Sequence, residues 1–113
     1  MLFRSLAVAC RDVATVYYRQ GKYVNAEELF NKALAIDIKI GNKEGEAAGY
    51  GNLGALFQSV GQYFKATEYQ EKALAIRMEI GDKNGEAACY TNLGNVFQSL
   101  GEYIKARDRK SVV

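Results

Sequence analysis

The stretch GQYFKATEYQEKALAIRMEIGDKNGE, residues 61–86, decides the fold because the chain uses it more than once. Forty residues earlier, residues 21–46 carry the variant GKYVNAEELFNKALAIDIKIGNKEGE. Forty residues later, residues 101–110 begin it again as GEYIKARDRK. Recurrence at a fixed spacing of about 20–50 residues is typical of stacked-repeat proteins. The sequence therefore predicts one structural unit that is used about two and a half times.

The units are set at residues 11–50, 51–90 and 91–110, and together they predict a single repeat domain over residues 1–113. Residues 1–10 align with the residues that precede each later unit, so we expect them to complete the first helix. The third unit lacks the Ala-Leu-Ala-Ile run of the other two. We therefore expect a truncated last repeat.

Composition narrows the function. A net charge of +2 gives no argument for nucleic acid or a membrane surface, and no apolar run approaches the roughly 18 residues of a membrane span. Cys10 and Cys89 lack CxxC spacing and the chain has no histidine, so we expect reduced thiols, no metal and a cytoplasmic location. Arg4 and Arg11, with no acid before Asp12, also suit a mitochondrial presequence, which the repeat alignment disfavours.

Apolar spacing predicts two helices in each unit. The first is expected over residues 5–19, 43–59 and 83–99, and the second over residues 23–40 and 63–80. Asn42 and Asp82 suit helix N-caps, and Gly41 and Gly81 suit C-terminal caps. Gly21, Gly61 and Gly101 are expected to take the left-handed conformation of a tight turn between the two helices. Short turns force antiparallel hairpins, which stack into an all-α, right-handed solenoid.

Small residues occupy matched positions in the two helices. They are Ala14, Gly54 and Gly94 in the first helix, and Ala26, Ala66 and Ala106 in the second. Missing side-chain bulk lets two helix backbones approach closely, so we expect the hairpin contact at these positions. Tyr17, Phe57 and Phe97 are expected to fill the space beside it.

These residues resemble the tetratricopeptide repeat, whose pattern is an aromatic residue, Leu-Gly, an aromatic residue and spaced alanines. The second unit gives Tyr50, Leu53-Gly54, Phe57, Ala66 and Ala73, with Gln70 at a further pattern position. The period is 40 rather than 34 and the closing proline is absent, so the second helix is longer. This long form resembles the repeats of Pins-type adaptors and of large tetratricopeptide arrays.

The resemblance implies a non-catalytic scaffold or adaptor, without cofactors, that binds a protein or peptide segment in the groove lined by the first helices. Carrying the groove positions over gives Arg11, Asp12, Thr15, Tyr18, Arg19, Asn52, Gln58, Ser59, Asn92, Asn95, Gln98 and Ser99. The asparagines at the repeated position are expected to hold the backbone amides of an extended peptide. A solvated polar helix face is the alternative interpretation of the same residues.

Two more specific functions, an enzyme and a clamp for a C-terminal carboxylate, do not fit the residues of this sequence. No histidine, phosphate-binding loop or activated nucleophile nominates a reaction, so no enzymatic activity is expected. A clamp for a chaperone C-terminal carboxylate needs a set of cations and asparagines, of which only Arg11 and Asn52 match.

The truncated end carries a further hypothesis. Arg109 stands where Leu29 and Tyr69 supply core contacts, so Phe97 and Leu100 are expected to be poorly covered. We therefore expect a fragment of a longer array, or self-association end to end through this surface, as the alternative function. The terminal Ser111-Val112-Val113 also resembles a ligand of a PDZ domain.

Overall fold

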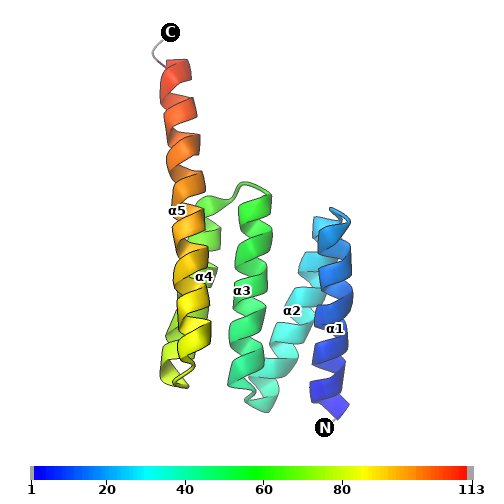
Figure 1. Ribbon diagram of the computed structural model, residues 1–113. Coiled ribbons are helices and arrows are strands. Elements are labelled where there is room, and N and C mark those ends of the chain that lie inside the picture. Colours follow the sequence, from blue (N-terminus) through cyan, green and yellow to red (C-terminus); the bar gives the residue numbers. More distant parts are fainter. Residues whose placement is uncertain (1, 112–113) are drawn as a thin grey trace.

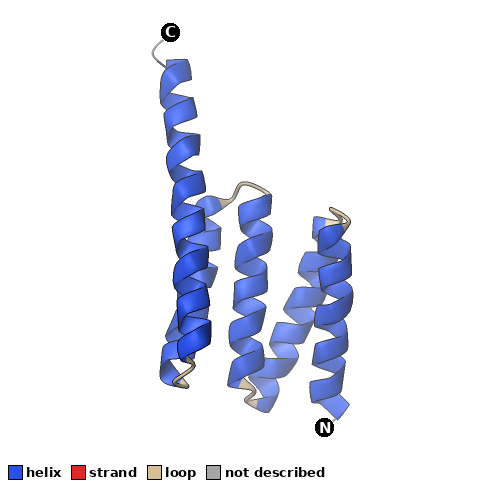
Figure 2. Cartoon of the chain, in the orientation of Figure 1, coloured by secondary structure: helices blue, strands red, loops and turns tan. Residues whose placement is uncertain are grey.

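The computed structural model describes residues 2–111, with side chains through Arg109, as helices joined by short turns. The helices are α1 (Leu2–Arg19), α2 (Tyr23–Ile40), α3 (Lys43–Ser59), α4 (Tyr63–Glu79) and α5 (Lys83–Ser111) (Figure 1). Figure 2 shows helices and loops and no strand in this part of the chain. The predicted all-α fold is confirmed. Val112 and Val113, the last residues of the proposed PDZ ligand, lie outside the described residues.

The predicted caps form at the junctions between units. The Asn42 side chain accepts a hydrogen bond from the Gly45 amide at 3.3 Å, and Asp82 accepts one from Gly85 at 2.9 Å. Each carboxyl or carboxamide oxygen satisfies an amide that the first helical turn leaves unpaired. Gly41, with φ 71°, ends α2 in the left-handed conformation, and its amide reaches back to Asp37 and Ile38.

The hairpins close where the sequence places small residues. Ala14 of α1 and Ala26 of α2 are both fully buried, and so is Ala66 of α4. Gly54 of α3 faces α4 so closely that an added Cβ would lie 2.6 Å from the Gln70 Nε2 atom. Absent side-chain bulk therefore sets the distance between the paired helices.

Aromatic rings fill the space beside this contact in the second hairpin. Phe57 of α3 stacks on Tyr69 of α4 with ring centroids 5.3 Å apart, and Tyr50 lies 6.0 Å from the same ring. The Lys65 ammonium group lies 4.3 Å from the Phe57 centroid. Close aromatic pairs of this kind add stabilisation beyond the area that they bury.

The third unit departs from the prediction. Gly101 was expected to make a left-handed turn, but α5 continues through it as one helix of 29 residues that projects past α4 (Figure 1). A second helix folded back on α5 would bring Arg109 to the position that Tyr69 fills in the second hairpin. That burial would cost charge desolvation, whereas a continuous helix keeps its backbone hydrogen bonds. The prediction of a turn at Gly101 was wrong.

The straight α5 leaves one helix face uncovered, as the sequence predicts for Phe97. Phe97 is 52% exposed, whereas its counterpart Phe57 is 4% exposed. Tyr90 is 54% exposed, whereas its counterpart Tyr50 is partly buried. A Cβ on Gly94 would meet nothing within 4 Å, in contrast to Gly54. The molecule is elongated, with principal extents of 59 × 31 × 18 Å.

Two glycine substitutions test the continuous helix. Gly101→Ala should stabilise the protein by about 0.5–1 kcal/mol, because alanine in a helix interior restricts the unfolded chain more than glycine does. Gly61→Ala is the matched control: its φ is +84°, so it should destabilise by about 1 kcal/mol. Urea unfolding followed by circular dichroism measures both. Destabilisation of similar size in both variants would show that Gly101 forms a turn.

Candidate functional site

The face made by the first helices of the units carries a cavity of about 280 Å³. Helices α3 and α5 form its sides and α4 lies behind them (Figure 1). Its lining combines small apolar residues with a few polar ones: Ala47, Ala48, Gly51, Asn52, Ala55, Gln70, Ala73, Arg77, Gly85, Ala88, Cys89 and Asn92. Small side chains keep the space open because they do not reach across from one helix to the next.

Asn52 and Asn92 meet at this cavity from neighbouring helices. Asn52 is partly buried on α3, and Asn92 is exposed on α5. Each carboxamide can donate and accept hydrogen bonds, which matches the alternating groups of a peptide backbone. The structure thus brings together the two predicted residues that share one repeat position.

Four other predicted residues pair with one another at the far end of the same face. The hydroxyl groups of Tyr18 and Ser59 lie 2.5 Å apart and share a hydrogen bond between α1 and α3. The Gln58 amide donates to the Ser99 hydroxyl at 3.4 Å, between α3 and α5. The two bonds join equivalent positions of successive units. They tie consecutive first helices together at one end of the face.

Arg11 has a structural partner. Its guanidinium forms an ion pair with Asp37 of α2, and the carboxylate of Asp37 is fully buried. The Asn42 amide also donates to Asp37, at 3.2 Å. A buried carboxylate needs such partners, since an unpaired charge away from water is costly. Arg11 therefore links α1, α2 and the turn before α3.

The next junction carries the same kind of pair with different residues. Arg77 lies at the repeat position of Asp37 and forms an ion pair with Asp82 at 2.8 Å. Cys89 is buried beside it, and burial raises the pKa of its thiol, with Asp82 adding to the effect and Arg77 partly opposing it. A thiol with a raised pKa stays protonated at neutral pH and is a poor nucleophile. Cys10 and Cys89 are free thiols.

The remaining predicted residues lie outside the cavity. Thr15 donates its hydroxyl to the Arg11 carbonyl within α1, at 2.9 Å. Exposed positions on α1 and α5 hold the others, which are Asp12, Arg19, Asn95 and Gln98.

Gln70 is a polar cavity residue that the sequence did not predict for the site. It lies on α4, the second helix of its hairpin, whereas the predicted groove comes only from first helices. Its side chain is 1% exposed. The available signal was a polar residue at a repeat position where the first unit has the core residue Phe30.

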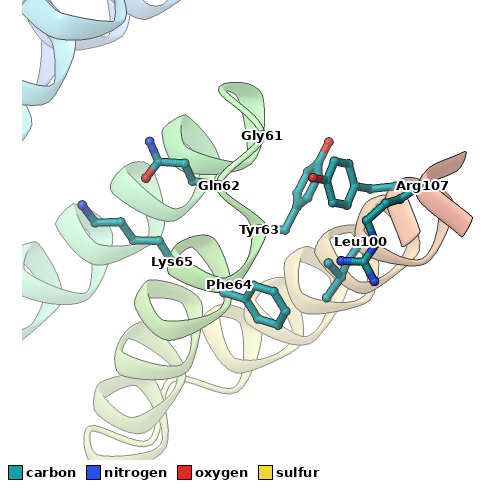
Figure 3. A pocket seen from close by; sticks show the side chains of 8 residues that line it. Gly61, Gln62, Tyr63, Phe64, Lys65, Leu100 and Arg107 are labelled. Atoms are coloured by element: carbon teal, nitrogen blue, oxygen red, sulfur yellow. The ribbon is translucent and has the colours of Figure 1, made fainter. Parts of the chain in front are cut away.

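A second depression, of about 420 Å³, lies between the start of α4 and the projecting part of α5. Leu100 and Arg107 of α5 approach it from one side and Tyr63 and Phe64 of α4 from the other (Figure 3). It exists because α5 continues past α4. Residues of the predicted groove do not line it, so we place the candidate site at the cavity between α3 and α5.

Within residues 2–111, no three residues of the metal-binding types gather into a cluster. In the same part of the chain, no helix combines the length and apolar character needed to cross a membrane.

Comparison with known proteins agrees with the helical repeat geometry. A family model described as tetratricopeptide repeat matches residues 5–77 and, in a second placement, residues 45–110. The chain belongs to the tetratricopeptide repeat family. The predicted resemblance is confirmed. Tetratricopeptide repeats are generally modules of protein–protein interaction and typically non-enzymatic.

Solved structures place the chain among tetratricopeptide solenoids. BtubC (BKLC) from P. vanneervenii is similar at 26% identity with a TM-score of 0.77, over 90% of this chain and 42% of that one. The tetratricopeptide domain of Arabidopsis FLU is 21% identical with a TM-score of 0.69. This match covers 98% of this chain and 99% of that one. The tetratricopeptide-like repeats of a putative kinesin light chain from Podospora anserina are 24% identical with a TM-score of 0.70. This match covers 92% of this chain and 51% of that one. The chain thus spans less than half the length of BtubC. No curated protein matches it.

The role of Arg11 can be tested by stability. Arg11→Met leaves Asp37 buried without its cation, so it should lower the free energy of unfolding by about 3 kcal/mol. Arg11→Met with Asp37→Asn should recover most of this loss, because no charge remains buried. Asp12→Asn, next to it but exposed, is the control and should change stability by less than about 0.5 kcal/mol. Equal effects of Arg11→Met and the control in urea unfolding would contradict the structural role.

Proposed function

We propose that this chain is a non-catalytic interaction module that holds an extended peptide segment of a protein partner between α3 and α5. The observation that carries the proposal is the cavity of about 280 Å³ with Asn52 and Asn92 on its two sides. A peptide in extended conformation presents unpaired amides and carbonyls, and carboxamide side chains can pair with both. The small side chains in the lining leave room for the backbone to approach.

Charge at the site favours an uncharged stretch of peptide. Arg77 lines the cavity and pairs with Asp82, and Arg11 at the preceding junction pairs with Asp37. A clamp for a terminal carboxylate needs cations that are available to the ligand. The pairing therefore argues against carboxylate capture and for recognition through backbone groups.

The free thiols support a reducing compartment, and we propose a cytoplasmic adaptor. In this proposal the partner is a protein, with no role for nucleic acid or a membrane.

The groove proposal is tested with peptides selected from a random library displayed on phage. Asn52→Ala and Asn92→Ala should each weaken a selected peptide about tenfold, since each removes a hydrogen-bonding carboxamide. Fluorescence polarisation with a labelled peptide gives the dissociation constants, and thermal unfolding checks the fold. Asn31→Ala, which removes an exposed carboxamide from α2, is the matched control and should bind as the wild type does. Unchanged binding by the double variant Asn52→Ala/Asn92→Ala would overturn the proposal.

A second function is favoured by the uncovered face of α5. Phe97 and Tyr90 are about half exposed there, and Gly94 between them leaves the backbone accessible. Exposed apolar side chains gathered on one helix face mark association surfaces. We propose end-to-end self-association through this face as the alternative.

Sedimentation equilibrium tests the alternative. If the chain self-associates through α5, Phe97→Ser combined with Tyr90→Ser should weaken association at least tenfold, because both rings would be lost from the contact. Val24→Ser is the control, since Val24 is 71% exposed but lies on α2, which does not contact α5 within the described residues. A wild-type chain that stays monomeric at the highest concentration reached would exclude this function.

A further inference from the structure

Gln70 distinguishes the second unit from the first. It lies forty residues after Phe30, so the two share one repeat position on α2 and α4. Both side chains are buried, Phe30 to 3% exposure and Gln70 to 1%. The second unit therefore has a carboxamide where the first has an aromatic ring, although a carboxamide gains less from burial.

One half of this carboxamide is paired and the other is not. The Nε2 atom donates to the Gly51 carbonyl of α3 at 3.1 Å. The Oε1 atom is buried and accepts no hydrogen bond from any described residue. The bond to Gly51 fixes the orientation, because turning the amide over would bring two acceptor oxygens together. A buried acceptor left unpaired is destabilising, so such an atom calls for an explanation.

The surroundings of Gln70 offer an explanation for its unpaired oxygen. Gln70 lines the cavity between α3 and α5 together with Asn52 and Asn92. Gly54 gives it space, since a Cβ there would lie 2.6 Å from Nε2. The residue that carries the buried acceptor thus lines a cavity that also carries two carboxamides able to donate.

The chemistry of the lining limits which chemical groups the cavity can bind. An unpaired acceptor requires a donor, so a purely apolar group would leave Oε1 unsatisfied. A cation is disfavoured because the Arg77 guanidinium also lines the cavity. A neutral group that donates and accepts fits best, with its N–H toward Gln70 and its carbonyl toward Asn52 or Asn92.

We propose that this cavity is a subsite for the primary carboxamide of an asparagine or glutamine side chain in the bound peptide, with Gln70 Oε1 as its acceptor. The proposal rests on the peptide-binding function proposed above and adds a side-chain preference to it. It makes Gln70, rather than an asparagine of the first helices, the residue that sets this preference.

Small probes test the subsite without a known peptide. Propionamide carries the carboxamide, and butanone has nearly the same shape but no N–H. Titration of isotope-labelled protein should give saturable shifts of the Gln70 and Asn52 side-chain amide signals with propionamide and none with butanone. Propanol, a hydroxyl donor, should bind at least fivefold more weakly than propionamide. Equal binding of butanone and propionamide, or no saturable shift with propionamide, would overturn the proposal.

Variants of Gln70 complete the test. Gln70→Met keeps the length of the side chain but removes the acceptor, so propionamide binding should fall about tenfold. Gln70→Phe introduces the residue that the first unit buries at this position, Phe30, so the variant is expected to fold. It lacks the acceptor, so it should also fail to bind propionamide. Thermal unfolding shows whether each variant is folded. Unchanged propionamide binding by a folded variant would exclude Gln70 as the acceptor.

Peptide selection separates this inference from the proposed function. Peptides selected on the wild type should be enriched in asparagine or glutamine at one position, and the enrichment should disappear on Gln70→Met. If selected peptides bind through Asn52 and Asn92 without this enrichment, the subsite is wrong and the groove stands. If no peptide is selected, the groove proposal fails, and the propionamide titration still decides whether the subsite exists.

Discussion

The close approach of two antiparallel helices at small residues is the contact on which the rest of the structure depends. Ala14 of α1 and Ala26 of α2 are buried in one core cluster in the first hairpin, and in the second Gly54 of α3 lies against Gln70 of α4 and Ala66 is fully buried. Because no side chain separates the backbones there, the flanking rings can pack on each other. Each hairpin thus becomes a rigid unit, and stacking the units brings the first helices onto one face.

Paired polar side chains link one hairpin to the next. Asp37, with Arg11 and Asn42, stabilises the first junction, and Arg77 with Asp82 stabilises the second. In each network an arginine, Arg11 or Arg77, is paired with an acid of the protein and is therefore not available to a ligand. The cavity between α3 and α5 is left with carboxamides and small apolar residues. That lining is suited to a peptide backbone and to neutral side chains.

The third unit shows what a hairpin requires. Its first half has the expected residues, and Val96 is fully buried against the preceding helices. Its second half lacks the apolar positions that would compensate for folding back, so α5 continues as one helix and exposes Phe97. Glycine at position 101 permits a turn but does not enforce one. The hairpin contact, rather than the glycine, decides whether the chain reverses.

The sequence by itself determined the period, the helices, the caps at Asn42 and Asp82 and the meeting of Asn52 with Asn92, because these depend on local spacing and on a fixed repeat. Only the tertiary structure decided the partner of Arg11 and the conformation at Gly101. It also decided that the Oε1 atom of Gln70 is buried without a hydrogen-bond partner, in a side chain that lines the cavity. These depend on which side chains from distant segments fill the same space. A repeat register gives a residue its position in the unit, but the charge and hydrogen-bond partners around it come from the neighbouring helices, and these differ from one unit to the next.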